Sequence, residues 1–371
     1  MLIGCVREIK EHEYRVGLTP SDVREYTRHG HSVVVERGAG LESGYADEIY
    51  TAAGARVVAH ADTVFAEADM IVKVKEPQPQ EVAKLRPGQL LYTYLHLAAD
   101  ETLTRGLLER GVDCVAYETI QEAGGQLPCL HPMSEIAGKL SVQEGAKYLE
   151  RAMGGKGILL GGVPGVRRGR VAIVGAGTVG FSACRVAVGM GADVWILDID
   201  RPKLLHVEDV LGSAVTPLFS THEHIEEALE WCDLLIGAVL IPGARAPRLV
   251  RREDLGRMAE GSVLVDVAID QGGFAETSRP TTHSQPTYVE DGVVHYCVTN
   301  MPGTVSETAT RALTATTLRY GLQLAAMGPR EAAAESPAIR HGLNILGGQL
   351  TNQAVAESFG IEWVEPLLAG T

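Results

Sequence analysis

The stretch "RVAIVGAGTVGFSACRVAVGMGADVWILDID", residues 170–200, decides the fold. A β-branched run leads into Gly175, Gly177 and Gly180, a helix-like segment follows, and a second apolar run ends at Asp198. The first glycine permits a tight turn, the second lets backbone approach a pyrophosphate, and the third lets the helix pack against the strand. The helix N-terminus offers free N–H groups to phosphates. This order predicts a dinucleotide-binding fold, with a glycine-rich turn of another α/β fold as the alternative.

The acid at the end of the second run bears on which dinucleotide binds. Asp198 lies 18 residues beyond Gly180, where a carboxylate can accept hydrogen bonds from the adenosine ribose hydroxyls. Its negative charge would repel a 2′-phosphate, which favours NAD. Arg201 and Lys203 are close in sequence and leave NADP open, although both residues are also typical of a solvated helix start.

Apolar runs alternate with helix-like stretches along most of the chain, which predicts an α/β fold with mostly parallel sheets. Strands are expected at 2–9, 32–38, 69–75, 89–97 and 113–119, with helices at 21–30, 45–54, 80–88 and 100–111. After the glycine-rich connector 154–169, further strands are expected at 170–175, 192–198, 233–239, 262–268 and 293–299. Helices are expected over 304–327 and near 330–343. We expect two doubly wound, Rossmann-like domains separated by a cleft, and the helical tail can return to the first lobe.

Composition excludes several classes of protein. The 371 residues are 45% hydrophobic and 22% charged, as in an ordinary globular protein, and the net charge is −14. Because such an acidic surface repels phosphate backbones, we expect neither nucleic acid nor an anionic membrane as a partner. The charged N-terminus does not resemble a signal peptide, and no apolar run is long enough to span a bilayer. The six cysteines contain no C-x-x-C pair, which favours reduced thiols in a cytoplasmic protein.

Polar residues cluster where strands of the first lobe are expected to end. In "QLLYTYLHLAAD" (89–100), Tyr92, Tyr94 and His96 would share one face of a strand. Arg15 follows the first strand and Lys75 ends another. Because ligands of open α/β sheets bind beyond the carboxyl ends of the strands, an arginine, a lysine and a histidine would face one crevice. Each also has a structural alternative: a core histidine, a surface arginine, and a lysine on a half-exposed edge strand.

Two further polar residues follow strands of the second lobe. Asp270 comes after strand 262–268, and Asn300 comes after strand 293–299. Both positions lie where a nicotinamide would bind in a dinucleotide-binding sheet. Both residues are also common in turns, so a turn or capping role is the alternative.

At these residues the chain resembles the alanine dehydrogenase family. The resemblance rests on "REIKEHEYRVGLTP", "VKVKEP", "LLYTYLHLA", "HPMSEIAGKLSVQEGA", "GGVPGV", "GAGTVG", "LVDVAIDQGG" and "NMPG", and it is strongest from residue 4 to residue 305. It implies reversible oxidative deamination of L-alanine to pyruvate and ammonia, with NAD as hydride acceptor. It also implies a homohexamer, a discontinuous substrate domain of residues 1–138 and 305–371, and an NAD domain of residues 139–304.

The resemblance implies roles for individual residues. Arg15 would hold the substrate carboxylate and Lys75 the carboxylate or keto oxygen, while His96 would be the acid/base and Asp270 its catalytic partner. A guanidinium fork suits a carboxylate, and histidine exchanges protons near neutral pH. Tyr94, Met133 and Asn300 would line the pocket. NAD would be surrounded by Ser134, Gly175, Gly177, Thr178, Val179, Gly180, Asp198, Lys203, Ser220, Val239, Leu240, Val267, Ala268, Ile269, Asp270, Arg279, Val298, Asn300 and Met301.

The chain departs from the family pattern after "NMPG". Val305, Ser306 and Glu307 stand where a proline and an arginine are expected, which leaves the helix entry open. Some relatives bind a divalent cation on the long helix that follows, but Gln323 and Met327 are poor ligands for a hard metal, so we predict no metal. The alternatives are the nucleotide-binding subunit of a proton-translocating transhydrogenase, a saccharopine-type dehydrogenase, and a non-catalytic NAD-binding regulator.

Overall fold

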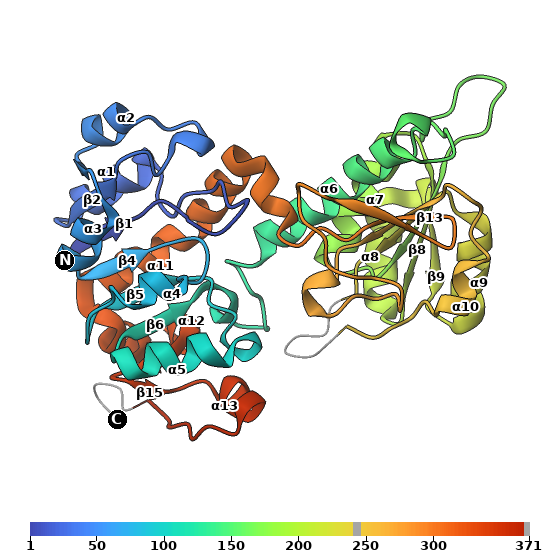
Figure 1. Ribbon diagram of the computed structural model, residues 1–371. Helices are drawn as coiled ribbons and strands as arrows, with labels where there is room; N and C mark the ends of the chain where they lie inside the picture. The colour runs from blue at the N-terminus through green and yellow to red at the C-terminus, as the bar shows by residue number, and fades with distance from the viewer. Residues whose placement is uncertain (240–245, 367–371) are drawn as a thin grey trace. The chain divides into compact units, whose positions relative to one another are not determined.

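The computed structural model describes residues 1–239 and 246–366, which form two compact units (Figure 1). Unit 1 comprises Met1–Met133 and Gly303–Thr371, and unit 2 comprises Ser134–Pro302. Each unit contains one large sheet in which most neighbouring strands are parallel. Helices cover these sheets, so the predicted α/β class is confirmed.

The sheet of unit 1 has the strand order β15-β14-β6-β5-β4-β1-β2-β3. The strands are β1 (Leu2–Cys5), β2 (Ser32–Glu36), β3 (Arg56–Val58), β4 (Met70–Val72), β5 (Leu90–Thr93), β6 (Asp113–Ala116), β14 (Leu343–Leu346) and β15 (Gln349–Leu350). All neighbours from β6 to β3 are parallel, whereas β14 runs antiparallel to both β6 and β15. The C-terminal part of the chain therefore completes one side of this sheet.

Helices cover both faces of this sheet. They are α1 (Pro20–Arg28), α2 (Asp47–Ala52), α3 (Ala61–Glu67), α4 (Pro79–Val82), α5 (Glu101–Arg110), α11 (Ser306–Glu335), α12 (Pro337–Gly342) and α13 (Gln353–Phe359), with the 3₁₀ turns η1 (Leu41–Ser43), η2 (Leu97–Ala99) and η3 (Tyr117–Thr119). On one face, Phe65 of α3, Leu107 of α5 and Val355 of α13 pack against the buried strands. On the other, Tyr92 donates to the carbonyl of Thr317 in α11 at 2.9 Å.

Local sequence explains how two of these helices begin or pack. At α1, Thr19 and Asp22 form a reciprocal capping box, and Pro20 occupies the first turn, where its missing N–H costs nothing. Within α11, Gly321 lies against α1, since a Cβ there would be 2.1 Å from the Tyr26 hydroxyl. The small residue thus permits the close helix contact.

The sheet of unit 2 has the strand order β12-β13-β11-β10-β7-β8-β9. The strands are β7 (Arg170–Val174), β8 (Asp193–Asp198), β9 (Thr216–Phe219), β10 (Leu234–Gly237), β11 (Val263–Asp266), β12 (Thr287–Glu290) and β13 (Val293–Tyr296). Neighbours from β13 to β9 are parallel, and only β12 pairs antiparallel among the described strands of this sheet. The order reverses between β7 and β10, where a doubly wound sheet places its ligand.

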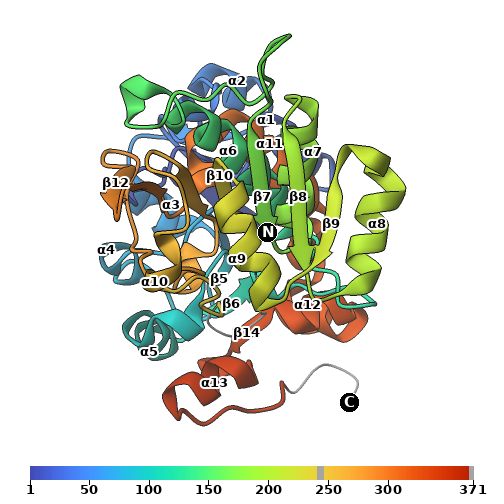
Figure 2. The ribbon, with the colours of Figure 1, turned by 90° about the vertical axis from the view of Figure 1, so that its right-hand side faces the viewer.

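The helices of unit 2 also cover both faces. They are α6 (His131–Tyr148), which begins in unit 1, α7 (Thr178–Gly189), α8 (Arg201–Leu211), α9 (His222–Trp231) and α10 (Arg252–Leu255), with the 3₁₀ turns η4 (Arg151–Met153), η5 (Gly212–Ala214), η6 (Ile269–Gln271) and η7 (Met301–Val305), the last running into unit 1. Ile225 and Leu229 of α9 pack against β7 and β10, and Figure 2 shows α9 lying over these strands. α6 packs closely against β10, because a Cβ on Gly145 would lie only 2.6 Å from the Leu234 side chain.

A buried acid anchors the glycine-rich connector of unit 2. Asp233, at the start of β10, is paired with Lys156 at 2.6 Å and with both terminal nitrogens of Arg167, at 2.7 and 3.0 Å. It also accepts the backbone N–H of Arg170 at 2.9 Å. Although burial alone would raise it, these bonds lower the pKa of Asp233 to about 2.

Several element boundaries differ from those expected. The strand predicted over 89–97 ends at Thr93, and the backbone then turns to a left-handed conformation at His96. The helix expected over 80–88 contains only four residues, 79–82. By contrast, the expected helix end at residue 327 is confirmed, because non-helical backbone at Gly328, φ 80°, interrupts α11 there before a second helical segment runs to Glu335. α6 was not predicted at all.

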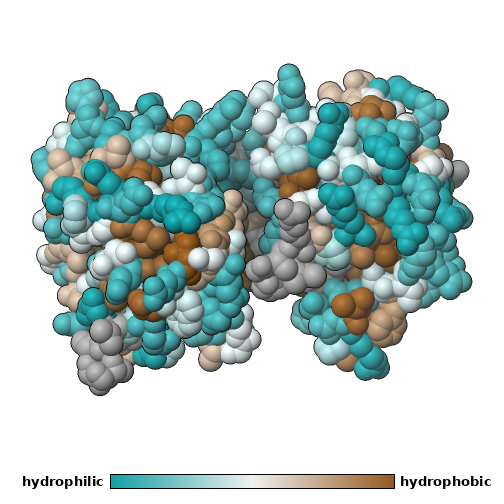
Figure 3. All heavy atoms as spheres, turned by 60° about the horizontal axis from the view of Figure 1, so that its bottom comes forward, coloured by the Kyte–Doolittle hydropathy of each residue, from teal (hydrophilic) through white to brown (hydrophobic). Residues whose placement is uncertain are grey.

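The surface agrees with the composition. On the face drawn in Figure 3, hydrophilic side chains surround apolar patches in both units. Within residues 1–239 and 246–366, no helix is both long and apolar enough to cross a membrane. All six cysteines are buried free thiols, as their spacing predicts.

Candidate active site

In unit 1, Arg15 is held in a buried ion pair beyond β1. Its Nε and Nη2 donate to the two carboxylate oxygens of Glu13 at 2.7 and 2.6 Å, and its Nη1 lies 3.1 Å from the Met133 sulfur. Arg15 is only 3% exposed. Burial would lower the pKa of Arg15, but the Glu13 carboxylate outweighs burial and raises it. The guanidinium is thus charged and fixed in orientation, and two of the predicted substrate residues, Arg15 and Met133, lie together.

His96 stands on an exposed turn between β5 and α5. Its φ and ψ are 50° and 38°, a left-handed conformation that costs a non-glycine residue about 1–2 kcal/mol. Its ring lies nearly parallel to the Tyr94 ring, with centroids 5.9 Å apart. Tyr94 is buried and donates to the carbonyl of Cys129 at 2.5 Å. The structure therefore brings His96 and Tyr94 together, although both lie beyond the end of the strand.

Lys75 follows β4 on a segment that a buried network fixes. Lys73 is fully buried, and its ammonium donates to Glu8 and Glu81, each at 2.9 Å. The other Glu8 oxygen accepts the N–H groups of Val74 at 2.6 Å and Lys75 at 3.4 Å. The two carboxylates raise the pKa of Lys73 despite its burial. β4 is a central strand, so the alternative of a half-exposed edge strand is wrong.

In unit 2, the fingerprint residues form the expected tight turn. Gly175 has φ 105°, and a Cβ there would lie 2.5 Å from the Ala238 carbonyl oxygen and 3.1 Å from the Val239 nitrogen. A Cβ on Gly180 would lie 1.7 Å from the Gly175 carbonyl oxygen, so α7 packs directly against the turn. By contrast, a Cβ on Gly177 would meet no atom within 4 Å. Backbone there is open to a ligand, and Thr178 and Val179 follow in the first turn of α7.

Asp198 is bonded to the fingerprint turn itself. Its Oδ2 accepts the N–H of Ala176 at 2.6 Å, and its Oδ1 accepts the N–H of Asp200 at 2.8 Å. The half-exposed ammonium of Lys203 lies 4.0 Å from Asp198 and 3.6 Å from Asp200. Asp198 thus links the end of β8 to the glycine-rich turn. Lys203 lies beside Asp198, as expected from its closeness in the sequence.

Other residues predicted to surround NAD lie near the same strand ends. Ser220 donates its N–H to the Asp198 carbonyl at 3.1 Å, and Val267 donates its N–H to Gly237 at 3.0 Å. The Arg279 guanidinium lies over the Tyr288 ring at 4.1 Å, and Asn300 has φ 58°. Of the remainder, Ala268, Ile269, Val298 and Met301 are buried, Ser134 is partly buried in α6, and Leu240 lies outside the described residues.

Asp270 is exposed in η6, on a loop that a second acid organises. Asp266, at the end of β11, accepts the N–H groups of Ala268 at 3.0 Å and Phe274 at 2.9 Å. Burial raises the pKa of Asp266 to about 6. Asp266 therefore fixes both ends of the loop that carries Asp270.

The residues that depart from the family pattern have defined contacts. Val305 caps α11 without a side-chain hydrogen bond, while Ser306 donates to the carbonyl of Glu42 at 2.5 Å. Glu307 pairs with Arg311 one turn later at 2.9 Å. Helix entry is thus tied to the segment 41–43 by a serine hydroxyl.

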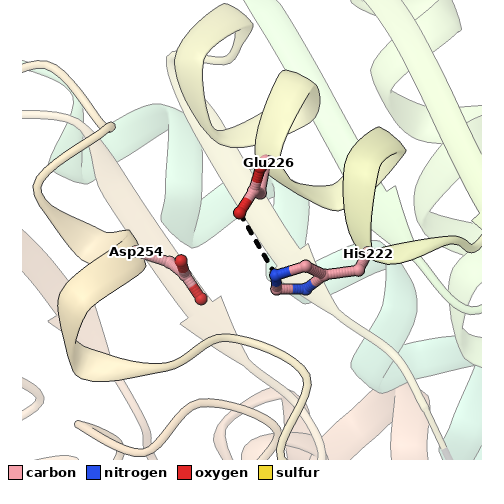
Figure 4. A group of neighbouring side chains, drawn as sticks. All are labelled: His222, Glu226 and Asp254. Atoms are coloured by element: carbon pink, nitrogen blue, oxygen red, sulfur yellow. Dashed lines mark ion pairs between the residues drawn. The ribbon is translucent and has the colours of Figure 1, made fainter.

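Gln323 and Met327 lie on α11, and the absence of a metal there stays a prediction. In the described part of the chain, one group of side chains has metal-ligating geometry: His222 and Glu226 of α9 and Asp254 of α10 point toward one another (Figure 4). Their charges are already engaged, since His222 pairs with Glu226 at 3.1 Å, Glu226 with Arg257 at 3.2 Å, and Asp254 caps α10. We therefore assign no metal to this group.

Sequence interpretation missed the carboxylates that support the site. Glu8 and Glu13 stand in the quoted "REIKEHEYR" but were not singled out. Glu118 accepts the N–H of His96 at 2.6 Å and was not singled out. It lies just past β6, so the rule that polar residues at strand ends mark a site would have found it.

Comparisons with known proteins agree with this arrangement. The profile "Alanine dehydrogenase/PNT, N-terminal domain" matches residues 4–137, and "Alanine dehydrogenase/PNT, C-terminal domain" matches residues 141–353. An alanine dehydrogenase of Halomonas elongata is 54% identical over 98% of this chain and 98% of its own. A solved L-alanine dehydrogenase is 50% identical, with a TM-score of 0.94 over 97% of this chain and 99% of its own.

A more distant solved structure, a transhydrogenase from Sinorhizobium meliloti, is 25% identical, with a TM-score of 0.81 over 95% of this chain and 100% of its own. Both family profiles match, and the nearer relatives cover almost the whole chain. This chain therefore belongs to the alanine dehydrogenase/PNT family.

Proposed function

We propose that this chain catalyses the reversible oxidative deamination of L-alanine to pyruvate and ammonia, with NAD as the hydride acceptor. The observation that carries the proposal is the buried, orientated guanidinium of Arg15, in a chain about half identical to alanine dehydrogenases over nearly its full length. A guanidinium stays charged when it is buried and carries five N–H donors, so Arg15 is suited to hold a small carboxylate in addition to Glu13.

In this proposal unit 1 is the substrate domain. Arg15 binds the carboxylate of alanine through the part of its guanidinium turned away from Glu13. Lys75 binds the carboxylate or, in the reverse direction, the keto oxygen of pyruvate. Tyr94, Met133 and Asn300 line the pocket, and the Lys73–Glu8 network keeps the Lys75 backbone in place.

Side chains of this protein must accept and donate the protons of the reaction. Oxidation of alanine removes a hydride from Cα and a proton from nitrogen, and water then replaces the amine, so the balance is alanine, NAD⁺ and water giving pyruvate, ammonium, NADH and one proton. His96 accepts and returns the protons, since imidazole changes charge near neutral pH. Asp270 is its catalytic partner. When bound, NAD supplies the hydride acceptor.

Unit 2 is proposed as the NAD domain, and its residues fit that cofactor. The open backbone at Gly177 and the start of α7 suit a pyrophosphate, and Asp198 suits the ribose hydroxyls. Ser134, Lys203, Ser220, Val239, Ile269, Arg279, Val298 and Met301 complete the proposed NAD surroundings.

We also propose that the enzyme works in the cytoplasm as a homohexamer on small-molecule substrates. Light scattering on the purified chain tests the oligomer. A mass other than six times 39.6 kDa would contradict it.

The decisive assay follows NADH absorbance with each of twenty L-amino acids, using NAD and NADP in parallel. We expect alanine with NAD to give the highest activity. His96→Ala is expected to lower turnover by about 10²–10⁴-fold while NAD still binds. Alanine oxidation at the normal rate by that variant would remove the acid/base assignment.

The transhydrogenase likeness makes one alternative concrete, a nucleotide-binding subunit that exchanges hydride between dinucleotides. Such a subunit would show no reduction of NAD by any amino acid. A non-catalytic NAD-binding regulator would behave alike in this assay and would also be insensitive to changes at His96 and Asp270. The closer similarity to alanine dehydrogenases supports the enzyme.

A further inference from the structure

The backbone at His96 is held by a carboxylate from a neighbouring strand. Glu118 lies in η3, directly after β6, and β6 pairs with β5, whose extension carries His96. Oε1 of Glu118 accepts the N–H of His96 at 2.6 Å and that of Leu95 at 3.2 Å, and Oε2 accepts the same Leu95 N–H at 3.2 Å. One side chain thus binds two consecutive backbone donors.

These two donors stand where the strand stops. β5 ends at Thr93, so the N–H groups of Leu95 and His96 have left the sheet ladder. His96 then adopts φ 50°, a conformation that a non-glycine residue keeps only when surrounding contacts impose it. On the other side, the His96 carbonyl accepts the N–H of Ala99 at 2.9 Å and starts η2. The Glu118 carboxylate is therefore the contact that fixes the entry to this turn.

We propose that Glu118 is a positioning residue for His96: its carboxylate holds the left-handed turn that aims the imidazole. The contacts run to the backbone of residues 95 and 96, so Glu118 takes no part in proton transfer itself. This inference rests on the proposed function, in which His96 is the acid/base. It goes beyond that function because it names the group that sets the direction of the imidazole.

Replacement of Glu118 tests the idea through activity. Glu118→Ala removes every acceptor, so we expect kcat for alanine oxidation to fall about 10–100-fold, the cost of a small misplacement of a catalytic group. The Kd for NAD should stay within about twofold, because Glu118 belongs to unit 1 and the residues proposed to bind NAD belong to unit 2. Glu118→Gln keeps one oxygen for the His96 N–H, so it should recover part of the lost activity.

A matched control separates positioning from general damage. Glu122 is a nearby carboxylate that binds Arg319 at 2.7 Å and the Tyr320 hydroxyl at 2.8 Å. Glu122→Ala therefore removes a comparable set of hydrogen bonds without touching residues 95 and 96. We expect its kcat to remain within about twofold of the parent. Amide hydrogen exchange in the peptide carrying residues 95–100 should accelerate in Glu118→Ala and not in Glu122→Ala.

A double variant gives the sharpest result. If Glu118 acts only through His96, then adding Glu118→Ala to His96→Ala should change the residual kcat less than twofold. An equal loss in both backgrounds would overturn the proposal, as would full activity of Glu118→Ala. If Glu118→Ala fails to fold, Glu118→Gln in the two backgrounds decides the same question. Absence of alanine-dependent NADH formation by the parent enzyme would instead refute the proposed function, and normal activity of His96→Ala alone would remove the acid/base assignment, so these failures are distinguishable from failure of the Glu118 proposal.

Discussion

The fingerprint glycines of unit 2 allow a prediction in which two similar substitutions have opposite consequences. In Gly180→Ala, the new methyl would lie 1.7 Å from the Gly175 carbonyl oxygen. Because an unstrained C···O contact is about 3.3 Å, α7 must retreat by about 1.5 Å. Such overpacking costs about 1–3 kcal/mol and occasionally more, and so large an overlap belongs at the upper end. We expect a loss of about 3 kcal/mol, or roughly 6–12 °C in Tm.

In Gly177→Ala, the methyl meets no protein atom within 4 Å, and φ is −71°, which any residue adopts. Gly177 is the N-cap of α7, where alanine is less favourable than glycine, but alanine also lowers the entropy of the unfolded chain by a similar free energy, so the unfolding free energy should change by about 0.5 kcal/mol or less. The same methyl would stand where backbone is proposed to approach the pyrophosphate, so the Kd for NAD should rise at least about tenfold.

Circular dichroism melting and a fluorescence titration with NADH measure the two quantities on the same preparations. Gly177→Ala should melt normally and bind poorly, whereas Gly180→Ala should melt early. A Gly177 variant that binds NADH with the parental Kd would refute the proposed path of the cofactor. A normal Tm for Gly180→Ala would refute the packing argument.

Three acids give further predictions. Asp198→Ser should weaken NAD more than NADP, because it removes the repulsion of a 2′-phosphate, and steady-state kinetics showing an unchanged preference would contradict this. Asp233→Asn should lower the free energy of unfolding at pH 7 by about 2 kcal/mol, because the native pKa of about 2 lies below the unfolded value of 3.8, and the deficit should shrink as pH falls below 4. For Asp266 the pH dependence is opposite, because its native pKa of about 6 exceeds the unfolded value of 3.8. As pH rises from 4 to 6, the free energy of unfolding of the parent should fall by up to about 3 kcal/mol relative to that of Asp266→Asn. Urea unfolding at several pH values checks both, and parallel curves would contradict them.

The parts of the fold that could be predicted were those with local chemistry. The turn around Gly175 could be predicted from closely spaced glycines that act on their immediate neighbours. The alternation of strands and helices could be predicted from the periodicity of hydrophobic residues. α6 was missed because its sequence has no clear apolar stripe. Its close contacts are made at small residues such as Gly138 and Gly145. The end of β5 was missed because apolar alternation continues past Thr93, whereas the Glu118 carboxylate, 22–23 residues away, removes two N–H groups from the ladder.

Some residues of the candidate site could likewise be predicted from the sequence, and others could not. Arg15, Lys75, His96 and Asp270 were picked out because unusual polar residues at strand ends are visible in one dimension. Glu13 was not, because nothing in a sequence distinguishes a carboxylate that binds a buried group from one that faces water, whereas Glu118 follows β6 and was overlooked although it stands at a strand end. The 118-residue separation of Arg15 and Met133, whose side chains touch, illustrates the same limit.

The interruption of unit 1 has a consequence for biosynthesis. Its core includes Ile345, Leu350 and Val355, and one side of its sheet is completed by β14. These residues leave the ribosome only after all of unit 2, so the N-terminal part of unit 1 must wait, with apolar strand surface uncovered, until β14 has been synthesised. Unit 2, a continuous run from Ser134 to Pro302, can close while synthesis is still under way. A truncation ahead of β14 would therefore harm the folding of unit 1 more than that of unit 2.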